Sequence, residues 1–310
     1  MQAVQAPELR PLGVGDVLDR TFNVYRAKPL LFIGLSAIWY LVLVLVFIAL
    51  AVAVFAGALA TFARQANNPG SPLAASPELL SGAVVGIIGF VIVGVVLAIL
   101  LFSAQSAALV DAGSRRYLSK EASIGESFRA GISAAGRLFV AGILAFLAIL
   151  ALWAVVFIVA GIIAAVAQGG ALGVLVLVLA GLIAIVGTFY IGASWLVAPV
   201  IVVLEKMGPM GALRRAWHLS EGNRWRIIGI QILLLILNLV LSVLLTGLFA
   251  FGGQSGQPGI GNVVQSLVNL ASTIVWAPVE WIAFTVLYYD LRVRKEAFDL
   301  QLAAEALPQS

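Results

Sequence analysis

Glu280 is the acidic residue whose position most strongly suggests chemistry. It lies in the stretch WAPVEWIAF, inside a long apolar run, where an ionisable side chain costs at least about 2.5 kcal/mol. Its carboxyl group should therefore face the interior of a helix bundle or a wet cavity, or be protonated, and a proton or cation site is one interpretation. The alternative is a residue near the external membrane interface that pairs with Gln265 or with another polar neighbour.

His218 is the single histidine of the chain and lies in RRAWHLSEGN. An imidazole can act as a general base, but neither a nucleophile nor a second histidine accompanies it. We therefore interpret it as solvated or as facing lipid phosphate. The chain has no cysteine, and neither metal-ligand spacing nor a Gly-rich phosphate loop occurs. We expect no catalytic residue, no metal site, no cofactor and no enzymatic activity.

Three acids lie where an apolar run ends beside basic residues. Such acids can form ion pairs between helices, with Arg20, Arg129 or Arg215 as partners, or they can lie at the membrane interface and only set the topology. The sequence leaves both interpretations open. The three acids are Asp111, Glu205 and Asp290.

The elements that must position these residues follow from the composition. Hydrophobic residues make up 62% of the 310 residues, charged residues 10%, and the mean hydropathy is +1.11, which a water-soluble domain of this size could not cover with polar surface. Each apolar run exceeds the roughly 20 residues that a helix needs to cross a bilayer, and in lipid such continuous runs must be helical. We predict an all-α, polytopic membrane helical bundle with six transmembrane helices, at about residues 29–62, 79–109, 138–167, 171–204, 226–252 and 263–289.

Proline and amide residues inside the runs are expected to shape the helices rather than to react. Pro199 and Pro278 each follow a Trp closely and should kink their spans, although broken helices also form the midplane sites of transporters. Gln105, Gln231 and Asn238 are residues of a kind that most often joins neighbouring helices through hydrogen bonds.

The basic residues are distributed very unevenly among the connections between the runs. All of the 18 Lys and Arg residues except Arg64 precede the first run, follow the last, or lie in the connections after the second and fourth. Because cytoplasmic flanks carry the excess of Lys and Arg, we predict that both termini are cytoplasmic. The net charge of +4 and the pI near 9.6 suit a face beside lipid, so the expected partners are anionic membrane lipids and no nucleic acid.

A repeated pattern occurs in the segments on this basic side. Residues 14–26, VGDVLDRTFNVYR, have one apolar and one polar face, as in an amphipathic helix at the membrane interface. The stretch LDRTFNVYRAKPLLFIG from Leu18 aligns without a gap with LRRAWHLSEGNRWRIIG from Leu213, and SFRAGISAAGRLF from Ser127 fits more weakly. We predict three interfacial amphipathic helices, each followed by a transmembrane hairpin, in a threefold pseudo-repeat. The arginines expected to contact lipid head groups are Arg20, Arg129, Arg214 and Arg215.

Three charged stretches of the chain carry a resemblance to a known family. The stretches RPLGVGDVLDRTFNVYR, ALRRAWHLSEGNRWRIIGI and LYYDLRVRKEAFDL resemble the membrane domain associated with bacterial glycerophosphodiester phosphodiesterases. The resemblance extends from about Leu9 to Leu300, and in the middle of the chain it rests on hydropathy alone. It implies a six-helix fold in the bacterial cytoplasmic membrane, and a link to glycerolipid head groups only where the phosphodiesterase domain is fused. We expect the stand-alone form, without the catalytic domain.

Two classes of function fit this sequence. The first is a non-enzymatic integral membrane protein, a lipid-interacting or scaffold module of the bacterial cytoplasmic membrane. The alternative is a transporter or lipid flippase, with a cavity between pseudo-repeated hairpins and Glu280 as its coupling acid. We favour the first class because the spans hold few polar residues. Both classes use one six-helix membrane domain, residues 1–300, followed by a flexible C-terminal tail, residues 301–310.

Overall fold

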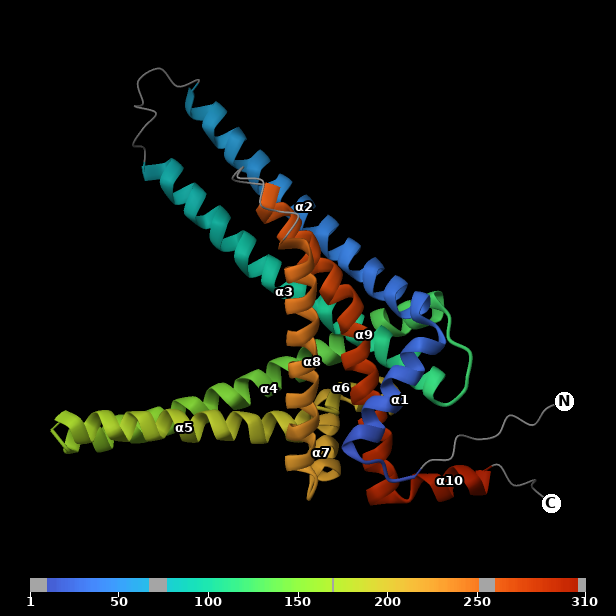
Figure 1. Ribbon diagram of the computed structural model, residues 1–310. Coiled ribbons are helices and arrows are strands. Elements are labelled where there is room, and N and C mark those ends of the chain that lie inside the picture. Colours follow the sequence, from blue (N-terminus) through green and yellow to red (C-terminus); the bar gives the residue numbers. More distant parts are fainter. Residues whose placement is uncertain (1–9, 67–76, 169, 251–259, 306–310) are drawn as a thin grey trace.

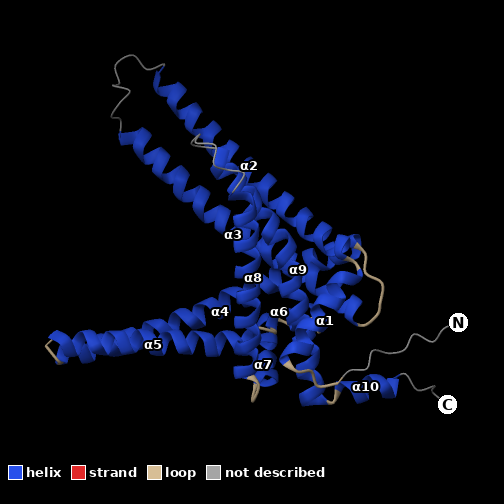
Figure 2. Ribbon diagram, viewed as in Figure 1, coloured by secondary structure: helices blue, strands red, loops and turns tan. Residues whose placement is uncertain are grey.

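The computed structural model describes residues 10–66, 77–168, 170–250 and 260–305, and all regular structure in these ranges is helical (Figures 1 and 2). Within the described ranges the helices are α1 (Val14–Ala27), α2 (Pro29–Ala66), α3 (Pro77–Tyr117), α4 (Ile124–Val166), α5 (Gly170–Trp195), α6 (Ala198–Leu204), α7 (Pro209–Ser220), α8 (Arg224–Ala250), α9 (Ile260–Glu296) and α10 (Phe298–Glu305).

Six helical segments in the described part of the chain are long and apolar enough to cross a membrane. They fold as helices because lipid offers the backbone no hydrogen-bond partners. The prediction of an all-α chain with six such segments is therefore confirmed for these residues, and the chain is a multi-pass membrane protein. The six segments are Pro29–Ala60, Val84–Tyr117, Ile124–Val166, Gly170–Leu204, Arg224–Leu248 and Gln265–Glu296.

Helices α1, α7 and α10 gather with the adjoining ends of α3 and α9 at one end of the bundle, which we call the basic end (Figure 1). Lys28 separates α1 from α2 with φ of −148° and ψ of 68°, because the following Pro29 disfavours the helical conformation of the residue before it. Between α7 and α8, Gly222 has φ of 78°, a conformation that glycine adopts without strain. Both breaks therefore come from local sequence.

The middle connection does not contain the predicted third surface helix. α4 runs without interruption from Ile124 to Val166, so that Arg129 lies in its second turn. This helix contains no proline, and its glycines are compatible with a membrane helix that packs closely on its neighbours. Nothing therefore ends the helix where α1 and α7 end. The predicted C-terminal tail includes part of α10, and residues 306–310 lie outside the described residues.

Several helices extend beyond the predicted apolar runs at the basic end. α3 continues to Tyr117 and α9 to Glu296, because ion pairs accommodate their charged residues within the helix. The predicted fourth span is broken between α5 and α6, with Pro199 in the first turn of α6, where a missing backbone donor is tolerated. Pro278, in contrast, lies inside α9 without interrupting it.

α9 lies at the centre of the bundle. It packs against α1, α2, α3 and α8, and 67% of its most apolar stretch is buried, compared with 0% for that of α2. Figure 1 shows the hairpin of α2 and α3 and the hairpin of α4 and α5 leading away from this centre in different directions. Both hairpins expose large apolar side chains along most of their length, as expected for surfaces that face lipid.

α4 crosses α3 at Gly131. A Cβ atom on this residue would lie 2.5 Å from the carbonyl oxygen of Ala104 and 3.0 Å from the Cβ of Ala108, so a side chain would collide with the backbone of α3. Trp39 of α2 packs on the same crossing, and its ring stacks on Phe128 of α4 with 4.5 Å between centroids. The two hairpins diverge from this point.

Candidate functional site

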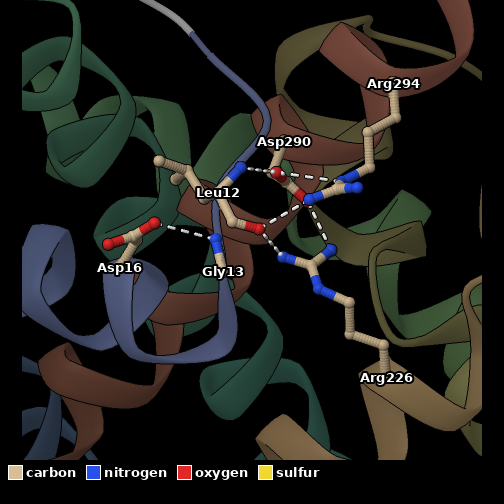
Figure 3. A network of polar contacts seen from close by, with 6 residues as sticks. All are labelled: Leu12, Gly13, Asp16, Arg226, Asp290 and Arg294. Carbon is tan, nitrogen blue, oxygen red and sulfur yellow. Dashed lines mark hydrogen bonds and ion pairs between the residues drawn. The ribbon is translucent and has the colours of Figure 1, made fainter.

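Asp290 is the centre of a buried charge cluster at the basic end (Figure 3). Its side chain is fully buried, and Arg226 Nη1 of α8 lies 2.5 Å from its Oδ2. Arg294 Nε, one turn further along α9, lies 3.1 Å from the same oxygen. The backbone amide of Leu12 donates to Oδ1 at 2.6 Å. Two guanidinium groups and one amide therefore converge on a single carboxylate.

The carbonyl oxygen of Leu12 accepts hydrogen bonds from both arginines. Arg226 Nη2 and Arg294 Nη2 each lie 2.6 Å from it, and the next amide, that of Gly13, donates to Asp16 Oδ2 at 2.9 Å (Figure 3). Buried charges are stable only when they are paired and hydrogen-bonded. The cluster therefore holds the segment before α1 against α8 and α9. Its polar groups form hydrogen bonds and ion pairs with one another.

A second cluster joins α7 to the end of α9. Arg215 Nε lies 2.5 Å from Glu205 Oε2, and its Nη1 lies 2.9 Å from Glu296 Oε1. Tyr288 donates its hydroxyl hydrogen to Glu205 Oε1 at 2.8 Å, and Arg292 Nε donates to Glu296 Oε2 at 2.9 Å. Burial lowers the pKa of Arg215, but its hydrogen bonds and ion pairs with the two glutamates raise it more, so the pKa lies above its ordinary value. Arg215 is therefore charged, and its charge is neutralised by Glu205 and Glu296.

A third cluster lies between the end of α3 and the start of α4. Arg115 Nε lies 3.1 Å from Asp111 Oδ2, and its Nη1 lies 2.7 Å from Glu126 Oε2. Ser127 donates its hydroxyl hydrogen to Asp111 Oδ2 at 2.9 Å. The short connection between the two helices is thus held by one arginine that contacts an acid on each side.

Each of the three predicted interhelix acids has a basic partner, and one partner is of the predicted kind. Glu205 pairs with Arg215 across helices. The other two acids do not pair with Arg20, Arg129 or Arg215. They use an arginine four residues further along their own helix, a spacing that brings side chains together and that could have been read from the sequence. These pairs are Asp111 with Arg115, and Asp290 with Arg294, to which Arg226 of α8 adds a second arginine.

The four arginines predicted to contact lipid head groups are not equivalent. Arg215 belongs to the second cluster. Arg20 is half-buried, whereas Arg129 and Arg214 are exposed. Within the described part of the chain, none of these last three has an ion-pair partner. Arg214 differs in that it also lines an apolar cavity.

An apolar cavity of about 620 Å³, which we call the α3–α4 cavity, lies where these two helices diverge. Phe102 of α3, Phe146 of α4 and Trp281 of α9 contribute to its walls. Its two serines, Ser103 and Ser106, donate their hydroxyl hydrogens to carbonyl oxygens of α3 itself, each at 2.8 Å. The cavity therefore presents an almost entirely apolar lining.

A second cavity of about 300 Å³ adjoins the α3–α4 cavity on the side of α7. Trp195 and Leu213 line both cavities. The smaller one is closed by α7, with Arg214 and Trp217 in its wall. Two adjacent apolar cavities thus lie beside an exposed guanidinium group.

Glu280 lies where two further cavities meet, midway along α9. One, of about 460 Å³, lies between α5, α8 and α9, and the other, of about 360 Å³, lies between α2, α3, α8 and α9. Asn238, Trp276 and Glu280 line both of these, which we call the Glu280 cavities. The carboxyl group of Glu280 therefore faces the inside of the bundle.

Gln265 does not pair with Glu280. Gln265 Nε2 lies 3.3 Å from Thr246 Oγ1 of α8 and 3.1 Å from Asn269 Oδ1, and about four helical turns separate it from Glu280. Among the residues that the structure describes, Glu280 has no hydrogen-bond or ion-pair partner.

The other polar residues singled out in the sequence have simpler environments. Gln105 Nε2 donates to Ser36 Oγ at 3.2 Å and so joins α3 to α2. Gln231 and Asn238 line the larger Glu280 cavity. His218 is exposed on α7, and no group of three or more His, Cys, Asp or Glu residues that could hold a metal occurs in the described ranges.

Comparison with known families gives one match. A family model described as "Domain of unknown function (DUF8558)" matches residues 1–299. The chain belongs to this family. The matched region contains all three charge clusters and all the cavities described above. No curated protein and no solved structure matches the chain. The family description names no activity and does not test the resemblance to the phosphodiesterase-associated membrane domain, which stays a prediction.

Proposed function

We propose that this protein is a non-enzymatic module that binds an anionic phospholipid at the basic end of its helix bundle. In this proposal one acyl chain fills the α3–α4 cavity and the phosphate lies against Arg214. The observation that carries the proposal is the adjacency of two apolar cavities, because Trp195 and Leu213 line both and Arg214 lines the second.

The α3–α4 cavity sets the position of the lipid. An acyl chain that moves from the bilayer into this cavity exchanges one apolar surrounding for another, so the gain comes from packing rather than from the hydrophobic effect. Lipids with different head groups carry similar chains. Selectivity therefore depends on the head group and on the residue that contacts it.

Arg214 supplies that contact. It is exposed and has no acidic partner among the described residues, whereas the adjacent Arg215 is neutralised by Glu205 and Glu296. A free guanidinium group can donate two parallel hydrogen bonds to a phosphate. A basic residue close to an anionic surface contributes about 1 kcal/mol, which is enough to favour anionic over zwitterionic lipid.

The proposal includes the orientation of the protein. Placing the basic end in the cytoplasm agrees with the excess of Lys and Arg on cytoplasmic flanks, and puts Arg214 beside a leaflet rich in anionic lipid. The resemblance to the membrane domain associated with bacterial glycerophosphodiester phosphodiesterases supports a bacterial cytoplasmic membrane and a glycerophospholipid ligand.

The pseudo-repeat is part of the same proposal. The pair α1 and α2 and the pair α7 and α8 each consist of a short helix, a break and a long apolar helix, which supports two equivalent units. In the proposed third unit the corresponding segment is fused into α4. Lying in the membrane interface, α1 and α7 would present Arg20 and Arg214, which have no ion-pair partner among the described residues, to lipid head groups.

The lipid proposal is tested by replacing Arg214 and measuring the phospholipid that stays bound. We expect Arg214→Gln to lower the retained anionic phospholipid about fivefold, as the loss of about 1 kcal/mol requires. Native mass spectrometry of the full chain in mild detergent measures this ratio. Added salt should weaken retention in the unmodified protein as well.

Lys295→Gln is the matched control, because it removes the same charge from an exposed position at the end of α9. Its lipid content should equal that of the unmodified protein. If Arg214→Gln retains as much anionic phospholipid as Lys295→Gln, the proposed site is wrong.

A further inference from the structure

A stripe of polar residues lies on the walls that α8 and α9 contribute to the Glu280 cavities. Its members recur at intervals of four or seven residues, so that on each helix they share one face. Each lines one or both Glu280 cavities, and we call the stripe the polar seam. It consists of Gln231, Asn238 and Ser242 on α8, and Asn269, Thr273 and Glu280 on α9.

Glu280 lacks the charge compensation that Asp290 has. Asp290 is held by Arg226, Arg294 and the Leu12 amide (Figure 3). The described residues that line the Glu280 cavities are otherwise uncharged, and Tyr40 is the other titratable side chain among them. Because an unpaired charge inside a membrane is strongly unfavourable, an ionised Glu280 needs a cation from outside the chain.

We propose that the Glu280 cavities bind an organic ammonium group, with Glu280 as its counter-ion. An ammonium nitrogen carries N–H donors, and the carboxylate and the amide oxygens of the polar seam are acceptors. Trp276 lines both cavities, and the face of an indole ring attracts a cation. Carboxylate, amides and indole together form a site for a soft, hydrogen-bonding cation.

The size and the donor set distinguish this ligand from a bare metal ion. The two cavities, of about 460 Å³ and 360 Å³, are far larger than one ion, and Glu280 is the single carboxylate among the described residues that line them. Calcium takes six to eight oxygen ligands, usually with several carboxylates among them. An alkylammonium group, by contrast, fills space with carbon and needs one counter-charge.

The ammonium group can come from two sources. It can belong to a small amine in water, or to the head group of an amine-bearing lipid. Ile232 and Leu235, in the wall of the larger cavity, are 50% and 67% exposed, so this cavity can be reached from the lipid-facing side of α8. The chemistry at Glu280 is the same for both sources.

Isothermal titration of the full chain in detergent with n-octylammonium tests the proposal. Octanol, which has the same chain and no charge, is the matched ligand. The unmodified protein should bind octylammonium, and Glu280→Gln, which keeps the size of the side chain, should weaken binding about tenfold or more, equivalent to about 1.4 kcal/mol. Octanol should bind both proteins weakly and equally. Equal binding of octylammonium to both proteins, or of octanol and octylammonium to the unmodified protein, overturns the proposal.

Asn238→Leu is a second variant that leaves Glu280 in place and replaces a shared polar wall of the two cavities with an apolar side chain. It should also weaken octylammonium binding, whereas Lys295→Gln should not. Undiminished binding in Asn238→Leu contradicts a site at this junction. Retained anionic phospholipid, measured on the same Glu280→Gln sample, should be unchanged, so that failure of the ammonium site and failure of the Arg214 site are distinguished.

Two further arms identify the source of the amine. Displacement of octylammonium by ethylammonium indicates a water-soluble amine. Retention of phosphatidylethanolamine from mixed nanodiscs by the unmodified protein, reduced in Glu280→Gln, indicates a lipid head group. The ammonium site is contradicted if ethylammonium does not displace octylammonium and if Glu280→Gln does not change the retention of phosphatidylethanolamine.

Discussion

Asp290 carries its charge out of contact with water, and the residues around it make this possible. We predict that Asp290→Asn lowers the free energy of unfolding by about 3 kcal/mol, because Arg226 and Arg294 lose their counter-ion. The value lies at the lower limit for a broken buried pair because the two arginine side chains keep 18% and 30% of their exposure. Denaturant or thermal unfolding in detergent measures the change.

Asp19→Asn provides the comparison for this change. Asp19 lies on an exposed side of α1, and the loss of an exposed charge changes stability by about 0.5 kcal/mol or less. Equal effects of the two substitutions would show that the Asp290 cluster does not stabilise the fold.

The sequence predicts the chemistry of single residues better than their partners. It marks Asp111, Glu205 and Asp290 as acids beside basic residues, and the spacing of four residues could have identified the partners of Asp111 and Asp290 within a helix. It could not identify Arg226 or the Leu12 backbone as partners of Asp290, because those contacts form only when α8 and the N-terminal segment pack on α9.

Gly131 determines how closely α4 packs on α3. We predict that Gly131→Ala lowers the stability by about 1–3 kcal/mol, because the new Cβ would lie 2.5 Å from the carbonyl oxygen of Ala104 and the helices would have to move apart. A lower melting temperature in detergent is the expected result.

Gly136 provides a control on the same helix. A Cβ on Gly136 meets no atom within 4 Å, and alanine is the better helix former. Gly136→Ala should therefore leave the melting temperature unchanged or raise it. A similar fall in both variants would show that the loss does not come from the close contact at the crossing.

Helix ends are predictable where a residue forces them and unpredictable where packing decides. Pro29 and Gly222 end or separate helices through their own backbone preferences. The continuity of α4 beyond Arg129 is different. A surface helix and a continuous helix are both compatible with that segment, and contact with α3 at Gly131 favours the continuous form.

The six membrane helices follow from apolar length alone, but their arrangement does not. α9 is the most polar of the six by mean hydropathy, 1.6 against 2.7 to 3.2 for the others, and 67% of its most apolar stretch is buried. Polar residues in a span therefore indicate a central helix. The divergence of the two hairpins (Figure 1) depends on the Gly131 crossing and on the charge clusters, which pair residues distant in sequence.

The central claim is that a phospholipid occupies the α3–α4 cavity with its phosphate at Arg214, and photocrosslinking tests it most directly. The full chain is placed in nanodiscs with a phosphatidylglycerol that carries a diazirine in one acyl chain, is illuminated, and is mapped by mass spectrometry. We expect crosslinks to concentrate on buried residues of the cavity wall, such as Leu138 and Trp281, and to fall about fivefold in Arg214→Gln. Crosslinks spread evenly over exposed faces such as Leu45 of α2, or unchanged in Arg214→Gln, would contradict the claim.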